Sequence, residues 1–236
     1  MSRSCAKKVI ILKHSRIWGG DRCSALLTAK GYRVDWCYPM EGEALPDPRG
    51  YSGAIIFGGK NSVNDADEWI IRELRWVEQC LEAGSAFLGL CFGGQLLAKA
   101  LGAEVAFHPE GLTEIGFTRI HPGEQADDLQ PMPEKLFQWH REGFDLPVDC
   151  TLLASSERYP NQAFRYRDRF YGLQFHPEVT HAVIEKWFEN NQDYHSEGLD
   201  PESRSRNLDY ARRHDDRITE WFSAFLERWL ESASDG

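Results

Sequence analysis

The 236-residue sequence lacks any apolar run that approaches the roughly 20 residues of a membrane-spanning helix. Its N-terminal apolar stretch, Val9 to Leu12, is far too short for the core of a signal peptide. Positive charge is also scarce, since 27 basic residues face 37 acidic ones and the formal net charge is −10. Such a chain repels nucleic acid and anionic membrane surfaces. We therefore expect no nucleic-acid partner and no membrane partner.

Paired metal and disulfide motifs are missing too. The six cysteines include no Cys-x-x-Cys pair, and a chain of this length does not need disulfide bonds to fold. The histidines show no ligand spacing such as His-x-x-x-His, so we expect no metal. No Gly-x-x-x-x-Gly-Lys-Ser/Thr loop is present, and no nucleotide site is evident. The sequence thus predicts a protein of the reducing cytoplasm that uses no cofactor.

Hydrophobic residues make up 42% of the chain and aromatic residues 12%, which is enough for a large core. We expect one α/β domain over residues 1–236. Strands alternate with helices in the first half: 8–13 strand, 21–30 helix, 32–38 strand, 53–57 strand, 67–83 helix and 86–90 strand. This alternation predicts an open, mostly parallel sheet flanked by helices, with functional sites at the carboxyl ends of its strands.

The second half of the chain changes to short runs with β character. These runs are 103–107, 114–121, 163–167 and 170–175, with a hairpin turn at Asp168. They predict a small antiparallel addition to the sheet. Residues 185–217 are rich in charge, and a helix is expected from Asp216 to Leu230. Its apolar face is expected to pack on the sheet, the alternative being a partner-binding surface.

Cys91 stands at the junction of an apolar strand and a helix, in the segment Gly-Leu-Cys-Phe-Gly-Gly-Gln. A sharp strand-to-helix turn at a nucleophile favours glycine next to it, because residues with a Cβ resist the required dihedrals. The helix, expected over residues 95–101, would favour the thiolate form of a cysteine at its N-terminal end. On its own, a cysteine in such a place is more often a small buried hydrophobe.

A second strand runs into His176-Pro177-Glu178. Residues i and i+2 of an extended segment point to the same side, so the imidazole and the carboxylate are expected to lie together, and Pro177 keeps the segment extended. On its own, such a segment is more often a turn. Two strand-end motifs of this kind are hard to explain as independent packing features. We therefore interpret Cys91, His176 and Glu178 as nucleophile, general base and orienting group.

The two motifs, Gly-Leu-Cys-Phe-Gly-Gly-Gln and Gly-Leu-Gln-Phe-His-Pro-Glu, resemble those of the class I, or triad, glutamine amidotransferases. The resemblance extends to Phe57-Gly58-Gly59-Lys60-Asn61, which looks like the family's oxyanion loop, and to Gln138-Trp139-His140. It covers about residues 8–190 and leaves 191–236 as a helical extension. It implies a flavodoxin-like fold. The pattern is most similar to stand-alone members that resemble the amidotransferase part of GMP synthetase, and to γ-glutamyl peptidases.

The resemblance also implies further site residues. The oxyanion donors would be the N–H groups of Gly59 and Phe92, and Gln95 and His140 would lie on the substrate side. From spacing alone, Gln95 could equally be a helix-surface residue and His140 a core histidine. The sequence departs from the family at Lys60, where many relatives have Pro, and at Gly94, where they often have Met or His. We expect Glu142 to replace the acid that relatives place near the histidine.

Three functions fit these residues. The first is hydrolysis of glutamine through a cysteine γ-glutamyl thioester, with ammonia passed to a separate synthetase chain, since no ATP-binding motif is present. The second is hydrolysis of γ-glutamyl peptides by the same triad. The third is an idle regulator that binds a partner through its aromatic C-terminal helix. The intact Cys91, His176 and Glu178 argue against the third.

Overall fold

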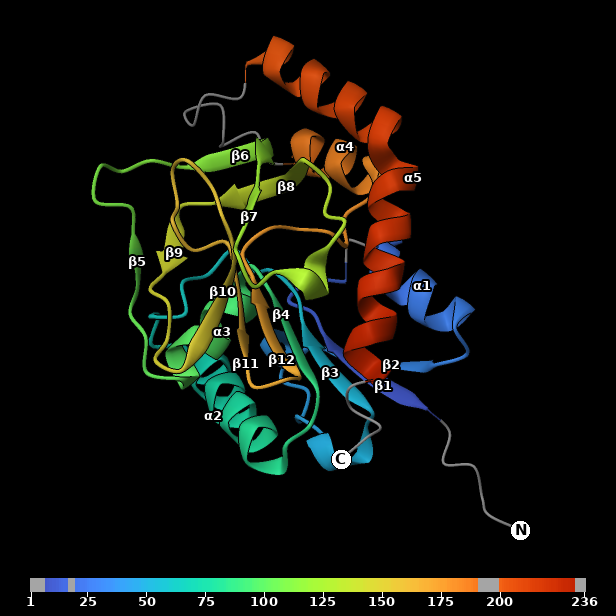
Figure 1. The fold of residues 1–236 in the computed structure, drawn as a ribbon. Helices are drawn as coiled ribbons and strands as arrows, with labels where there is room; N and C mark the ends of the chain where they lie inside the picture. Colours follow the sequence, from blue (N-terminus) through green and yellow to red (C-terminus); the bar gives the residue numbers. More distant parts are fainter. Residues whose placement is uncertain (1–6, 17–19, 191–199, 232–236) are drawn as a thin grey trace.

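The computed structural model describes residues 7–16, 20–190 and 200–231. Eight strands form its main sheet, in the order β2-β1-β3-β4-β12-β11-β10-β7. The first five of these strands are parallel, and the remaining three continue the sheet with antiparallel pairing. The expected open, mostly parallel sheet is confirmed, and Figure 1 shows it with helices on both sides.

The parallel part follows the alternation expected from the sequence. Its elements are β1 (Lys8–Leu12), α1 (Arg22–Ala29), β2 (Arg33–Cys37), β3 (Gly53–Ile56), α2 (Glu68–Ala83), β4 (Phe87–Leu90) and α3 (Phe92–Ala100). Strand β12 (Phe170–Leu173) lies beside β4 although its residues come 83 positions later in the chain, since Phe170 pairs with Phe87 and Leu173 with Leu90. This crossover brings the two strand-end motifs together.

The antiparallel addition is also confirmed. Strands β11 (Ala163–Tyr166), β10 (Cys150–Ser155) and β7 (His121–Pro122) extend the main sheet. Two separate pairs lie beside it: β5 (Val105–Phe107) with β9 (Glu142–Phe144), and β6 (Glu114–Arg119) with β8 (Lys135–His140). Short 3-10 turns occupy 39–41, 48–50 and 127–129. Strands β8, β9 and β10 were not assigned as strands from the sequence.

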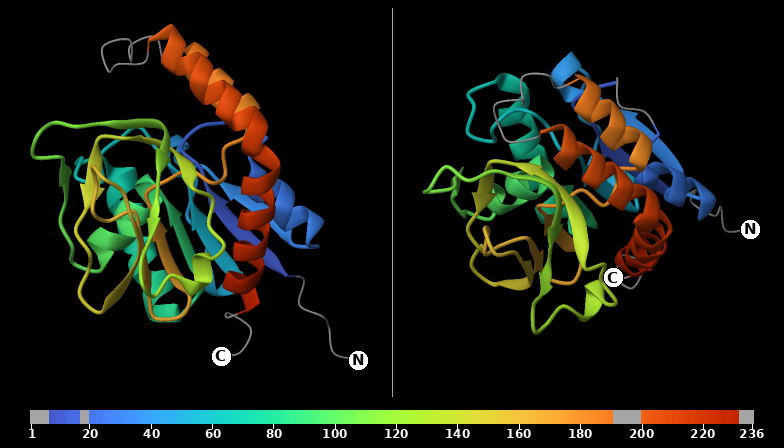
Figure 2. Two further views of the ribbon diagram at one scale, coloured as in Figure 1. Left: turned by 45° about the horizontal axis from the view of Figure 1, so that its top comes forward. Right: turned by 90° about the horizontal axis from the view of Figure 1, so that it is seen from above.

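Residue alternation along the central strands builds a core on each face of the sheet. Val9 and Ile11 pack with α1 and with α5 (Pro201–Glu231), whereas Ile10 and Leu12 pack with α2 and α3. The views in Figure 2 agree that α1 and α5 cover one face while α2 and α3 cover the other. The aromatic face of α5, centred on Trp221, is buried in the first core. The alternative that this face binds a partner is therefore wrong.

Two element boundaries differ from the expectation. Helix α3 begins at Phe92, not at Gln95, because Gly93 and Gly94 are its first-turn residues and allow close packing on the sheet. Helix α5 begins at Pro201, not near Asp216, and lies against α4 (His181–Asn190). Its first half has few apolar residues, but Leu208 and Ala211 pack on the cluster around Phe137. Contacts with this cluster therefore stabilise the first half of α5, which the sequence analysis identified only as rich in charge.

Candidate active site

Three neighbouring strands, β3, β4 and β12, end at the same edge of the sheet. Cys91 follows the last residue of β4, and its N–H donates to the carbonyl oxygen of Leu173 at the end of β12 (2.7 Å). His176 comes three residues after Leu173, and Gly58 comes two residues after the end of β3. A Cβ placed on Gly58 would lie 2.7 Å from Cε1 of His176 and 3.6 Å from Cβ of Cys91. The structure thus brings all three segments into contact.

Cys91 has the strained backbone of a nucleophile elbow, with φ 52° and ψ −106°. Non-glycine residues rarely adopt a positive φ, and such strain is concentrated at functional sites. The residue caps α3, is 5% exposed, and lies against two polar groups from neighbouring strand ends. Nε2 of Gln174 donates to Sγ at 3.5 Å, and the carbonyl oxygen of Trp139 lies 3.9 Å from Sγ. The sulfur is therefore held by side-chain and backbone contacts as well as by the turn.

His176 and Glu178 form the expected pair. Nδ1 of the imidazole lies 2.8 Å from Oε1 of Glu178, and both side chains are buried. Burial by itself lowers the pKa of His176, but the charges of Glu178 and Cys91 raise it, to about 10. Nε2 of His176, also buried, has no hydrogen-bond partner among the described residues. The arrangement leaves this nitrogen available for a reacting group.

The loop that carries this pair is fixed by Arg22, which the sequence analysis did not single out. Nη1 of Arg22 donates to the carbonyl oxygens of Pro177 (2.6 Å) and Val179 (2.7 Å). The backbone N–H of Arg22 donates to the carbonyl oxygen of Glu178 (2.7 Å). The same guanidinium bonds Asp215 and Thr219 of α5. Arg22 therefore connects the His-Pro-Glu segment to the C-terminal helix.

The two expected oxyanion donors come from the residue after Cys91 and from the loop after β3. Phe92 is the first residue of α3, where the N–H groups have no partner within the helix. Gly59 belongs to the loop after β3, which lines the same pocket as Cys91. Both backbone segments are thus close to the sulfur.

Gln95 is buried, so the alternative of a helix-surface glutamine is wrong. It lines the pocket, and its Nε2 donates to the carbonyl oxygen of Glu142 (3.0 Å) and to Oε1 of Gln174 (3.2 Å). Since Gln174 in turn donates to Cys91, an amide chain links Gln95 to the sulfur. Gln174 lies two residues before His176 in the segment that follows β12, and residues with this spacing in an extended segment point to the same side. This spacing could have indicated that Gln174 reaches Cys91.

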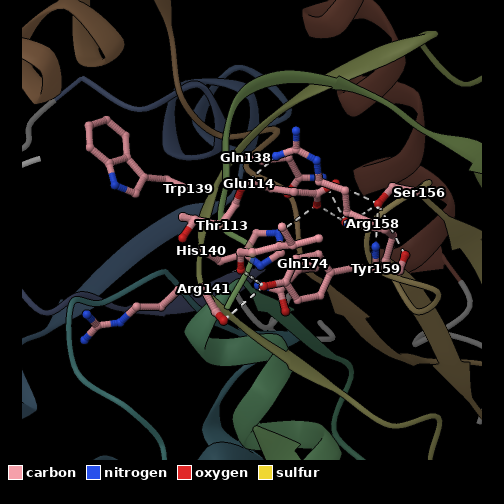
Figure 3. A network of polar contacts seen from close by, with 12 residues as sticks. Thr113, Glu114, Gln138, Trp139, His140, Arg141, Ser156, Arg158, Tyr159 and Gln174 are labelled. Carbon is pink, nitrogen blue, oxygen red and sulfur yellow. Dashed lines mark hydrogen bonds and ion pairs between the residues drawn. The ribbon is translucent and has the colours of Figure 1, made fainter. Parts of the chain in front are cut away.

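His140 also lines the pocket and is buried. Its Nε2 lies 3.1 Å from Oε2 of Glu114, and its Nδ1 lies 3.0 Å from the carbonyl oxygen of Glu142. The expectation that the Glu142 carboxylate partners this histidine is wrong, because that carboxylate accepts a hydrogen bond from Ser62 instead. The acid is Glu114, which comes from the paired strand β6, as Figure 3 shows. Glu114 is 26 residues from His140 in the sequence, so local spacing could not indicate this pair.

The pocket around these groups has a volume of about 430 Å³, within the range of small-molecule sites. Besides the groups above, it is lined by His14 and Lys60 and by Trp139 and Trp187. In the described part of the chain, no cluster of three or more metal-ligating side chains occurs. Nor is any helix there both long and apolar enough to cross a lipid bilayer.

A cysteine at a strand-to-helix elbow lies next to a buried His–Glu pair on a parallel α/β sheet, which is the kind of arrangement in which a nucleophile, a base and an orienting group meet. A family model, glutamine amidotransferase class-I, matches residues 27–193. The chain belongs to this family.

Individual relatives agree with this assignment. The glutamine amidotransferase-like protein YfeJ of Salmonella typhimurium is 31% identical over 187 residues, 74% of each chain. GMP synthase of Aeropyrum pernix is 33% identical over 155 residues, which is 62% of this chain but 28% of the synthase. γ-Glutamyl peptidase 5 of Arabidopsis thaliana is 28% identical over 65% of each chain. A solved glutamine amidotransferase from Thermotoga maritima superposes with a TM-score of 0.87 at 29% identity, covering 96% of this chain and 99% of that one.

Proposed function

We propose that the protein hydrolyses the γ-glutamyl amide bond of glutamine, with Cys91 as nucleophile, His176 as general acid and base, and Glu178 as the group that orients His176. One observation carries the proposal: the cysteine and the His–Glu pair lie at the ends of the adjacent strands β4 and β12. The family and its GMP synthase and γ-glutamyl peptidase relatives support hydrolysis of γ-glutamyl amides in general. In this proposal the chain is one domain, with a core at about residues 8–190 and a helical extension.

The first half of the reaction forms a thioester. With its pKa raised to about 10, His176 holds a proton at neutral pH, and in this mechanism Cys91 attacks as the thiolate beside it. The sulfur attacks the γ-carbonyl carbon, and the N–H groups of Gly59 and Phe92 stabilise the oxyanion. His176 then gives its Nε2 proton to the leaving nitrogen. Ammonia leaves, and Cys91 carries the γ-glutamyl group.

The second half restores the enzyme. Neutral His176 takes a proton from water, and the hydroxide attacks the thioester carbon. The carbon–sulfur bond breaks, glutamate leaves, and the thiolate–imidazolium pair forms again. Glu178 stabilises the charge of His176 at both ends of the cycle.

The acceptor of the ammonia would bind on a separate chain. The alignment with GMP synthase spans only 28% of that enzyme, so most of the synthase has no counterpart in this match. We propose a synthetase partner that receives the ammonia. The absence of a nucleic-acid partner and the cytoplasmic location stay predictions from the sequence.

Hydrolysis of γ-glutamyl peptides is the second candidate. It is favoured by the pocket, whose aromatic side chains Trp139 and Trp187 could contact a leaving group larger than ammonia. The similarity to a γ-glutamyl peptidase points the same way. The chemistry is the same except that His176 protonates an amine.

The test is release of glutamate from glutamine and from glutathione by the wild-type protein and by Cys91→Ala. We expect glutamine to be cleaved, and the variant to be slower by at least about 10³-fold because it has no nucleophile. Cys150→Ala is the matched control, since this half-buried thiol lies on β10 away from the pocket, and its activity should be unchanged. Cleavage of glutathione alone would establish the peptidase, and an active Cys91→Ala would refute the mechanism.

A further inference from the structure

A third buried histidine–carboxylate pair lies at the same pocket as the pairs His176–Glu178 and His140–Glu114. His14 comes two residues after the end of β1 and lines the active-site pocket, while Glu73 comes from the first half of α2. Nε2 of His14 lies 3.1 and 3.2 Å from the two carboxylate oxygens of Glu73. The other ring nitrogen, Nδ1, lies 3.0 Å from the carbonyl oxygen of Gly58. The pair thus connects α2 to the loop that carries Gly59.

The two acceptors define the protonation state of His14. A carboxylate and a carbonyl oxygen only accept hydrogen bonds, so each needs an N–H from the ring. A neutral imidazole has one N–H and would turn a lone pair toward one of the two oxygens. Burial lowers the pKa of His14, yet the Glu73 charge and the two hydrogen bonds raise it above its ordinary value overall. With Glu73 ionised, both contacts are satisfied together only when His14 is protonated and donates on both sides.

The surroundings hold this ion pair in place. Glu73 is fully buried, and a buried carboxylate is tolerated only when it is paired. The rings of Trp69 and Phe92 pack on the imidazole, with centroids 5.2 and 4.8 Å away. The neighbouring charge, Lys13, is in an ion pair with Asp21. Aromatic rings favour a cation between them, so packing and charge agree.

The contact with Gly58 matters because of peptide geometry. The Gly58 carbonyl and the Gly59 N–H belong to one planar trans peptide unit, in which the C=O and the N–H point in opposite directions. Two successive glycines allow such a unit to rotate easily. A hydrogen bond that fixes the Gly58 oxygen therefore also fixes the direction of the Gly59 N–H. A Cβ on Gly59 would lie 3.1 Å from Nδ1 of His14, so the ring packs directly against this loop.

We propose that His14 and Glu73 are a positioning pair that fixes the Gly58–Gly59 peptide plane, so that the Gly59 N–H is preorganised as an oxyanion donor. The role assigned to Gly59 rests on the function proposed above. Both ring nitrogens of His14 are engaged by Glu73 and Gly58, so the pair acts through the backbone of the loop. Preorganised donors act mainly in the transition state, so the pair supports kcat and not substrate binding.

The kinetic test compares three variants with the wild type on whichever γ-glutamyl substrate it cleaves. The double variant H14F/E73M keeps a ring beside Trp69 and Phe92 and leaves no unpaired buried charge, so it is expected to fold. We expect its kcat to fall about 10- to 100-fold with KM within about threefold. Glu73→Gln should stay within about threefold in kcat, because a neutral His14 can then donate to Gly58 and accept from the amide.

Val77→Ala, on the same helix and fully buried, is the control for lost packing alone. It should lower the midpoint of thermal unfolding and leave kcat of the folded protein unchanged. A double variant with wild-type kcat would overturn the proposal. So would a Val77→Ala variant whose kcat falls as far as that of the double variant.

A second readout needs no activity and separates this proposal from the proposed function. In NMR spectra at pH 7.5, both ring nitrogens of wild-type His14 should carry a proton, and one should in Glu73→Gln. The amides of Gly58 and Gly59 should have order parameters near 0.85 in the wild type and below about 0.6 in the double variant. A singly protonated wild-type ring, or unchanged order in the double variant, would refute the pair's role. Wild-type protein that cleaves no γ-glutamyl compound would refute only the proposed function.

Discussion

At the scale of single residues, Glu178 determines how His176 titrates. The carboxylate and the sulfur of Cys91 raise the pKa of His176 to about 10, so the imidazolium persists through neutral pH. A raised pKa means that the stabilisation from this pair is complete below the unfolded-state pKa of about 6.5 and is lost as the pH rises through about 10. In the proposed mechanism, the acid that protonates the leaving group is lost over the same upper range of pH.

For wild-type protein we predict an alkaline limb of kcat/KM near pH 10. Glu178→Gln keeps a hydrogen-bond acceptor but removes the charge, so the limb should move to lower pH and kcat should fall by about 10² or more. The measurement is the pH dependence of kcat/KM, with circular dichroism to verify folding at each pH. Glu185→Gln removes an exposed carboxylate on α4 and should leave the limb in place. A limb that does not move in Glu178→Gln would contradict this assignment.

At the scale of elements, the elbow depends on how closely α3 approaches the sheet. A Cβ on Gly93 would lie 2.2 Å from the carbonyl oxygen of Ile56 and 2.8 Å from its Cβ, so strand β3 leaves no room for a side chain. Gly93→Ala should therefore push the helix off the strand and move Cys91. The glycines after the cysteine serve helix packing as well as the turn.

We predict that Gly93→Ala lowers the free energy of unfolding by about 3 kcal/mol or more, or prevents soluble folding. Urea unfolding is the measurement. Gly50→Ala is the matched control, because a Cβ there has no atom within 4 Å and the backbone φ is ordinary. Its effect should stay within about 0.5 kcal/mol. Equal effects of the two substitutions would show that close packing at Gly93 does not limit stability.

At the scale of the whole molecule, Arg22 links three parts of the chain. It begins α1, bonds the carbonyl groups around Glu178, and reaches Asp215 and Thr219 on α5. Burial lowers its pKa while Asp215 raises it, and the net direction is downward. Helix α5 therefore supports the His-Pro-Glu segment through one buried guanidinium.

Arg22→Met should keep the volume of the aliphatic stem but lose these hydrogen bonds. We predict a loss of about 2–4 kcal/mol in stability, since several buried carbonyl groups lose their donor. We also predict a lower kcat, because the His176–Glu178 segment loses its support. Thermal unfolding and glutamate release measure the two effects. The control is Glu227→Gln, which removes an exposed ion pair with Lys30 between the same two helices. It should change neither quantity, and an Arg22→Met protein with unchanged kcat would contradict the coupling.

The sequence by itself determined the features that depend on neighbouring residues. The strand-to-helix turn at Cys91, the same-side placement of His176 and Glu178, and the alternation of strands and helices follow from local patterns. So does the apolar face of α5, whose burial the spacing of Ile218, Trp221 and Phe225 predicts. Local sequence specifies these because dihedral preference and side-chain periodicity act over a few residues.

Only the tertiary structure decided which distant groups meet. Glu114 pairs with His140 because β6 and β8 are neighbours. The expectation that Glu142 supplies the acid beside His140 is therefore wrong. His14 meets Glu73 across 59 positions, and Arg22 meets the carbonyl group of Pro177 across 155. An unpaired charge in the folded core costs several kcal/mol, so a buried charged group pairs with an opposite charge that lies close to it in the fold. Spacing along the chain does not predict which distant residues lie close together.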